Sequence, residues 1–180
     1  MSAWGDLDEL LDRGVTEVVA GRGDVVAQCR AFAARRSPRV IRHPDRRLYL
    51  SRYYLVGGPL SPRPFDRNGK PLPGVKWSSL PHGLYLHHFH ASDLPRLHNH
   101  PWRIASSLML AGGYREFRLD EEPREVLPGD RTRLSRATYH RVELLAPEAW
   151  TLFAVGEFVG SWGFKSAGVA RQGPSSRLAW

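Results

Sequence analysis

The stretch LPRLHNHPWRI, residues 94–104, places two histidines one residue apart, directly before a proline and a tryptophan. On a β-strand the side chains alternate between the two faces, so His98 and His100 are expected to point to the same side. Imidazole nitrogens are good ligands for iron, nickel, copper, zinc and cobalt. The pair therefore predicts part of a metal site, although a solvated or hydrogen-bonded pair of histidines has the same spacing.

The composition is that of one globular domain. The chain has 180 residues, 42% of them hydrophobic and 24% charged, which is enough to enclose a sizeable core. No apolar run reaches the roughly 20 residues of a membrane span, and the acidic start MSAWGDLDELLDRG lacks the features of a signal peptide. The single cysteine, Cys29, cannot form an internal disulfide. We therefore expect a cytoplasmic protein with no membrane partner.

The chain is basic, with 26 Lys and Arg against 18 Asp and Glu and a formal net charge of +8. The arginines are scattered, and the longest basic stretches, RTRLSR at 131–136 and PDRR at 44–47, are short. Nucleotide bias in the host genome would explain the excess, and so would a site for an anionic partner. Nucleic acid is the less favoured partner because it would require a basic stripe.

Hydrophobic periodicity divides the chain near Ser37. Apolar residues recur at three- and four-residue steps between 3 and 36, which predicts two helices separated by GRGD at 21–24, with Asp24 as N-cap. Beyond Ser37, short apolar or alternating runs are separated by turn residues, as in an antiparallel sandwich or barrel. We therefore predict an all-β domain over 37–180 with an N-terminal helical extension over 1–36.

The predicted strands cover 40–43, 48–56, 83–90, 103–110, 114–119, 131–134, 140–145, 150–155 and, less regularly, 159–164. The proline-rich segment 57–81 is expected to be a surface loop with DRNGK, residues 66–70, at its turn. The tail after 165 shows no periodicity, and Leu178 and Trp180 are its candidates for docking on the domain.

The spacing around the two histidines resembles the first motif of the cupin superfamily, G-x5-H-x-H-x3,4-E-x6-G. His98 and His100 take the histidine positions, and Gly112 takes the closing glycine. Ser92 stands at the opening glycine and Ala105 at the glutamate, so two positions depart from the pattern.

A second stretch resembles the other cupin motif, G-x5-P-x-G-x2-H-x3-N. Gly129 and His140 fall at the expected spacing, whereas Ser135, Ala137 and Leu144 replace the proline, second glycine and asparagine. The resemblance covers about 84–164 and implies a cupin double-stranded β-helix, or jelly roll, in which His140 is the third metal ligand. The sequences HNHPW, LAGGYREF and WGF are similar to a poorly characterised group of bacterial and phage cupins with an H-x-H-P-W core.

Ala105 in place of glutamate leaves three neutral histidines, so a divalent ion would keep its full charge and free positions. This ligand set is similar to that of cysteine dioxygenase and related thiol dioxygenases, which bind Fe(II) through three histidines. The chain lacks the Ser-x-His-x-Tyr stretch of that enzyme. The alternative is a degenerate cupin that has lost both the glutamate and the metal.

Residues near the motif complete the candidate site. His87 is a candidate acid/base or a hydrogen-bond donor to a metal ligand, and equally a core histidine. Arg52 and Tyr54 share one face of a strand; Arg52 would bind a substrate carboxylate and Tyr54 would move a proton, unless Arg52 lies at the surface.

Two tryptophans and one carboxylate are the remaining candidates. Trp102 and Trp162 would wall the substrate pocket, although core packing explains large aromatic residues as well. Glu116 is a candidate substrate contact or a displaced metal-binding carboxylate, with a salt bridge to Arg118 or Arg52 as the simpler interpretation.

Together these features predict a metal-dependent cupin enzyme. The leading hypothesis is a non-haem Fe(II) oxygenase, such as a dioxygenase, that uses O2 on a small anionic molecule. Nickel, cobalt, copper, zinc and manganese stay open as the metal, and an isomerase, lyase or hydrolase stays open as the reaction. A non-catalytic ligand-binding cupin and an accessory protein that docks a partner through its helices are the alternatives outside the enzymes. By analogy with other cupins, a homodimer is expected.

Overall fold

The computed structural model describes residues 3–60, 65–66, 68, 70–76, 78–80 and 82–165. The predicted docking of Leu178 and Trp180 lies outside these residues. The described part of the 57–81 segment supports a turn at DRNGK, because Phe65 and Pro71 form a β-bridge and Asp66 N–H donates to the carbonyl of Lys70 at 2.9 Å.

The two predicted helices are confirmed. Helix α1 spans Ala3–Val18 and helix α2 spans Val25–Ala34. Asp24 is the N-cap of α2, and its carboxylate accepts a hydrogen bond from Val26 N–H at 2.9 Å. Among the described residues, no helix is both long and apolar enough to cross a bilayer.

Short strands make up the rest of the chain. They are β1 (Arg39–Arg42), β2 (Leu48–Val56), β3 (Gly83–Phe89), β4 (Leu97–His98), β5 (Ile104–Ala111), β6 (Tyr114–Arg118), β7 (Arg124–Val126), β8 (Arg131–Ser135), β9 (His140–Leu144), β10 (Ala149–Val155) and β11 (Phe164–Lys165).

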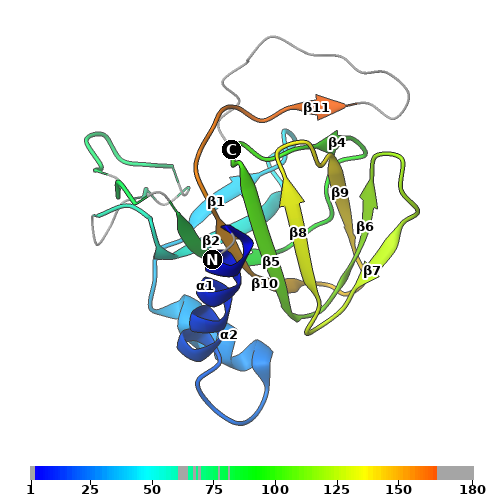
Figure 1. Ribbon diagram of the computed structural model, residues 1–180. Helices are drawn as coiled ribbons and strands as arrows, with labels where there is room; N and C mark the ends of the chain where they lie inside the picture. Colours follow the sequence, from blue (N-terminus) through cyan, green and yellow to red (C-terminus); the bar gives the residue numbers. More distant parts are fainter. Residues whose placement is uncertain are drawn as a thin grey trace.

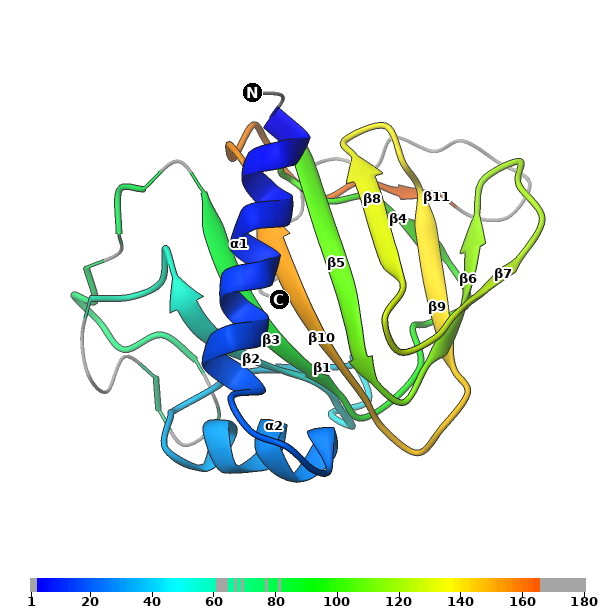
Figure 2. The ribbon, with the colours of Figure 1, turned by 60° about the horizontal axis from the view of Figure 1, so that its bottom comes forward.

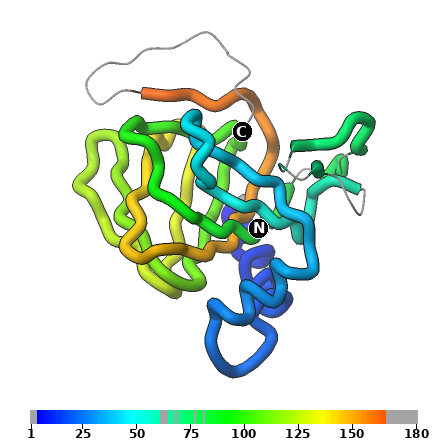
Figure 3. Tube along the Cα trace, turned by 180° about the vertical axis from the view of Figure 1, so that it is seen from behind, coloured from blue at the N-terminus to red at the C-terminus, as the bar shows by residue number. Residues whose placement is uncertain are grey.

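These strands form two antiparallel sheets. One sheet has the order β1-β2-β3-β10-β5-β8, and the other has the order β11-β4-β9-β6-β7 (Figure 1). The predicted all-β class with an N-terminal helical extension is confirmed. Helix α2 and strand β11 lie at opposite ends of the β domain, as the view from behind also shows (Figure 3).

Helix α1 lies across the outer face of the larger sheet (Figure 2). Leu7 and Leu11 of α1 belong to the same buried cluster as Leu84 of β3 and Leu152 of β10. The opposite face of β10 carries Phe153 into the interior cluster with Trp102. Because the helix covers one face and the barrel interior covers the other, every residue of β10 is buried.

Two glycines of the cupin-like motifs occupy positions that favour glycine. Gly112, between β5 and β6, has φ +79°, and a Cβ there would lie 2.3 Å from the carbonyl oxygen of Glu148. Gly129, before β8, has φ +96°. L-residues with a side chain rarely adopt this region. The motif spacing therefore reflects the backbone of two turns that connect the sheet strands.

The strand predictions were wrong in two places. The prediction missed β4 and β7, each of which has two or three residues and directly follows a proline-containing segment. The predicted strand at 159–164 is reduced to β11 and a single bridge between Phe158 and Trp102. Strands this short carry too few residues for alternation to be visible in the sequence.

We predict that Leu152→Ala lowers the free energy of unfolding by about 2–5 kcal/mol, because it leaves a cavity between α1 and the larger sheet. Leu152 is 0% exposed. Leu127→Ala is the matched control, since Leu127 is 47% exposed, and its expected change is within about 0.5 kcal/mol. Chemical denaturation of both variants measures the difference, and equal stabilities would show that the helix is not packed as described.

Candidate metal centre

Three histidines, two on neighbouring strands and one just after a strand, converge at one end of the barrel. His98 ends β4 and is the register partner of His140, the first residue of β9. His100 follows two residues after His98, beyond the end of the strand. The strand alternation from which the common direction of the two side chains was expected therefore does not extend as far as His100.

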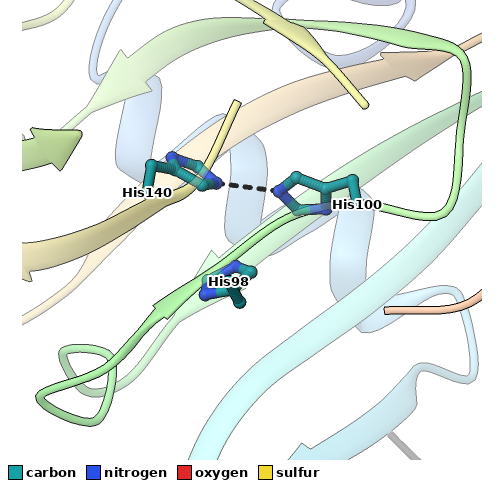
Figure 4. A group of neighbouring side chains, drawn as sticks. All are labelled: His98, His100 and His140. Carbon is teal, nitrogen blue, oxygen red and sulfur yellow. Dashed lines mark hydrogen bonds between the residues drawn. The ribbon is translucent and has the colours of Figure 1, made fainter. Parts of the chain in front are cut away.

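The candidate ligand atoms of His98, His100 and His140 all lie within 4.8 Å of one another. The Nε2 atoms of His100 and His140 are 2.8 Å apart, and His98 lies beside them (Figure 4). The predicted convergence of these side chains is confirmed. Among the residues that the structure describes, this is the one group of three or more His, Cys, Asp or Glu side chains with candidate metal-ligand atoms this close together.

A buried carboxylate fixes the ring of His140. Glu116 on β6 is 0% exposed, and its Oε1 lies 2.8 Å from Nδ1 of His140. An ionised carboxylate can only accept, so the Nδ1–H of His140 donates. Arg118 Nε, at 3.1 Å, and Arg124 Nη2, at 2.6 Å, hold the other carboxylate oxygen. His140 is thus oriented with its Nε2 atom toward the other two histidines.

The environment keeps Glu116 charged. Burial by itself raises the pKa of this carboxyl, but the hydrogen bond from His140 and the positive charges of Arg118 and Arg124 outweigh it and lower the pKa to about 2. Glu116 is therefore a carboxylate at neutral pH.

The histidines of strand β4 and the loop after it are neutral at pH 7. Burial lowers the pKa of His98 to about 4, and it lowers the pKa of His100 well below the usual value, with further lowering from His140 and His98. A neutral imidazole offers a lone pair to a metal ion, whereas an imidazolium does not.

The donor set fits a divalent metal ion. Across the 2.8 Å contact between His100 Nε2 and His140 Nε2, one nitrogen donates a proton and the other accepts it. The other ring nitrogen of His100, Nδ1, is buried without a hydrogen-bond partner among the described residues. A cation in place of the shared proton would receive lone pairs from both rings, so the residues present suit a metal bound by imidazoles.

No carboxylate joins the three histidines within the described part of the chain. Ala105, at the glutamate position of the motif, is buried on β5 in the interior cluster with Trp102 and Phe153. Besides Glu116, Asp93 lies close to the histidines, with its Oδ2 4.0 Å from His98 Nδ1. That carboxylate accepts hydrogen bonds from Tyr49 OH and, at 2.7 Å, from Val142 N–H.

The histidines line an interior cavity of about 290 Å³ between the two sheets. Of the sequence-predicted site residues, His87, Arg52, Trp102 and Trp162 line the same cavity. Rings of Trp102 and Trp162 have centroids 5.8 and 4.8 Å from that of His100. The cavity is small enough to require a ligand of modest size.

Two predicted site residues lie elsewhere. Glu116 does not border the cavity, because His140 and two arginines enclose it; its predicted substrate contact is corrected to the support of a candidate ligand, and the predicted salt bridge with Arg118 is present. Tyr54 lines an adjoining surface depression with Tyr85 and not the histidine cavity, so its predicted role in proton transfer finds no geometric support.

His87 orients Arg52. Arg52 Nε donates to His87 Nε2 at 2.9 Å, so this nitrogen is an acceptor and His87 is neutral. Burial lowers the pKa of His87 well below its usual value, and the charge of Arg52 lowers it further. Among the described residues His87 bonds to Arg52 and not to a candidate metal ligand, so the hypothesis of a donor to a ligand is not supported.

The sequence reasoning missed one wall of the cavity. Arg39, Ile41 and His43 alternate along and just beyond β1, and all three line the cavity. His43 is buried, and its Nε2 lies 3.0 Å from the carbonyl oxygen of Ser92. The two-residue alternation in RVIRH, residues 39–43, was the signal that could have identified this wall.

The middle residue of the H-x-H stretch secures the segment that ends in β11. Asn99 N–H donates to the carbonyl of Gly163 at 3.0 Å, and its side-chain oxygen accepts from Gly163 N–H at 2.6 Å. Phe164 in turn pairs with His98 across β11 and β4. These contacts place Trp162 against the candidate ligands, with its ring centroid 5.6 Å from that of His98.

We predict that Glu116→Gln weakens metal binding by about 10- to 100-fold, because the neutral amide no longer fixes the ring of His140. Glu125→Gln is the matched control. Glu125 pairs with Arg115 at the surface, at 3.0 Å, and lies on the edge strand β7, which β6 separates from the strand of His140. Competition with a chelator of known affinity measures both variants. Unchanged metal affinity in Glu116→Gln would contradict a role of this hydrogen bond in metal binding.

A scan against protein-family models finds no match, and a search of curated proteins finds none either. Solved structures do resemble the chain. The DMSP lyase DddQ from Ruegeria pomeroyi is 18% identical with a TM-score of 0.55, and the match covers 79% of this chain and 68% of that one.

Two further similar structures are more distant. A cupin-like protein from Thermotoga maritima is 16% identical, with 65% and 76% of the two chains covered and a TM-score of 0.45. KdgF from Halomonas sp. is 13% identical, with 69% and 91% covered and a TM-score of 0.47. At these identities the likeness concerns the fold alone. Two antiparallel sheets, the histidine cluster between them and the likeness to the DMSP lyase together show that the chain has the cupin double-stranded β-helix fold.

Proposed function

We propose that the protein is a metal-dependent enzyme, a non-haem Fe(II) oxygenase that acts on a small anionic molecule. The observation that carries this proposal is the convergence of three imidazoles, one of them held by a hydrogen bond to Glu116 with its Nε2 atom toward the other two. Burying an imidazole nitrogen without a hydrogen-bond partner, such as Nδ1 of His100, costs free energy. Stability of the core therefore does not explain the cluster, whereas a binding function does.

His98, His100 and His140 would hold the ion. When bound, Fe(II) supplies a charge that stabilises developing negative charge and free positions for O2 and substrate. No carboxylate joins the three histidines in the described residues, so none of the candidate ligands carries a negative charge that would directly offset the charge of the ion. This favours an anionic substrate at the same centre.

Arg52 would hold the anionic group of the substrate. Its guanidinium is buried at 8% exposure, lines the cavity, and forms no ion pair with any described carboxylate. The hydrogen bond to His87 occupies Nε and leaves the two terminal nitrogens for a ligand. Trp102 and Trp162 would exclude water from the space between Arg52 and the histidines.

We predict that protein purified without a histidine tag and reconstituted anaerobically with Fe(II) binds about one ion per chain, and that His140→Ala lowers the affinity at least about tenfold. His82→Ala is the control, because His82 is exposed and outside the triad. Elemental analysis after desalting gives the metal content. An oxygen electrode then measures O2 uptake with a panel of small carboxylates and phosphate esters.

The possible results separate the alternatives. Stoichiometric iron with substrate-dependent O2 uptake, both lost in His140→Ala, supports the oxygenase. Bound metal with substrate turnover but no O2 uptake contradicts the oxygenase and indicates a metal-dependent isomerase, lyase or hydrolase. Absence of metal binding in the wild-type protein contradicts an enzyme of this kind and leaves a non-catalytic ligand-binding cupin.

A further inference from the structure

We infer that Arg39 and Arg52 together bind a doubly charged, tetrahedral oxyanion group, and that the ligand of the cavity is a phosphate monoester with a small apolar body. The inference rests on the proposed function only in treating this ligand as the substrate. The anion site itself is defined by residues outside the histidine cluster.

The two arginines face each other across neighbouring strands. Arg39 of β1 and Arg52 of β2 are direct register partners in an antiparallel pair, so their side chains leave the same face of the sheet about 5 Å apart. Like charges in this arrangement repel each other. Both arginines line the histidine cavity as well as the adjoining depression that contains Tyr54 and Tyr85.

No described protein group neutralises this pair. Neither arginine forms an ion pair with a described carboxylate. Arg52 is partly stabilised by aromatic faces, with its Cζ atom 5.0 Å from the ring centroid of Tyr85 and 5.8 Å from that of Trp102. Tyr85 is not an anion, because burial raises the pKa of its hydroxyl to about 12 despite the two nearby arginines.

The rest of the cavity has the same sign of charge. Arg96 also borders it, and its Cζ atom lies 4.3 Å from the ring centroid of Phe164. Among the described lining residues Asp93 is the one acid, and its oxygens already accept hydrogen bonds from Tyr49 and Val142. Three arginines against one engaged carboxylate leave an excess of positive charge that a ligand with a single charge would only partly offset.

The geometry favours a tetrahedral dianion over a carboxylate. One guanidinium can satisfy a planar carboxylate through two parallel hydrogen bonds. Two guanidiniums from separate strands approach one anion from different directions, and a phosphate monoester offers three terminal oxygens with about 1.5 to 2 negative charges.

The distance to the histidines limits the size of the ligand body. Trp102 lies between the two sites: Arg52 Cζ is 5.8 Å from its ring centroid, and that centroid is 5.8 Å from the ring centroid of His100. A body of about one ring, lying against Trp102, would therefore connect the anion site with the metal site. The cavity of about 290 Å³ suits such a molecule.

Phenyl phosphate and benzoate test the inference, because they share a ring and differ in the anionic group. Isothermal titration calorimetry is run on the protein as purified and again after treatment with a chelator. We expect phenyl phosphate to bind at least about tenfold more tightly than benzoate in both preparations, and to weaken below pH about 6 as the ester loses its second charge.

The variant Arg39→Gln should weaken phenyl phosphate binding about tenfold and affect benzoate less, since it removes one of two contacts to the dianion. Arg42→Gln, on the same strand but exposed, should leave both affinities unchanged, and circular dichroism verifies that both variants are folded. Equal or tighter binding of benzoate, absence of phenyl phosphate binding, or unchanged affinity in Arg39→Gln would overturn the inference. Phenyl phosphate binding that depends on Arg39 in a protein that binds no metal would refute the proposed enzyme and leave the anion site standing.

Discussion

The hydrogen bond between Glu116 and His140 is the constraint on which the rest of the candidate site depends. It connects adjacent strands β6 and β9, and it requires a proton on Nδ1 of His140. Burying a carboxylate is costly, and here Arg118 and Arg124 offset that cost. The polar network lies on the outer side of His140, and Nε2 faces the other two histidines on the inner side. The orientation of His140 toward the cavity is thus fixed by charged groups that lie on its other side.

Both the central strand β10 and the side chain of His87 are packed on two sides. Helix α1 covers the outer face of β10, which frees the inner face to carry Phe153 toward the cavity. His87 of β3 is likewise held between the ring of Phe153, 5.0 Å away, and the guanidinium of Arg52. Rigid packing behind each polar side chain means that the cavity is shaped before any ligand enters it. This preorganisation reduces the entropy that binding must overcome.

The sequence predicted the parts of the structure that local rules govern. Spacing identified His98, His100 and His140, because the turns at Gly112 and Gly129 impose fixed backbone geometry around them. The predicted strand 83–90 is β3, where His87 lines the cavity and its neighbour His88 pairs with Glu148 outside it. The role of Glu116 was not predictable in this way, since β6 and β9 meet only in the folded sheet. Arg39 was missed for the same reason: its significance comes from its partner Arg52 and not from its neighbours in the chain.

Asn99 connects the cavity wall that contains Trp162 to the backbone between two of the candidate metal ligands. The residue sits between two candidate ligands, and its backbone and side chain both bind Gly163. Moving the segment that carries Trp162 would therefore pull on the very backbone that spaces His98 and His100. The position of this wall and metal binding by the histidines are then coupled. By thermodynamic linkage, metal binding would stabilise the wall in its present position by the same free energy by which the wall in that position would stabilise the bound metal.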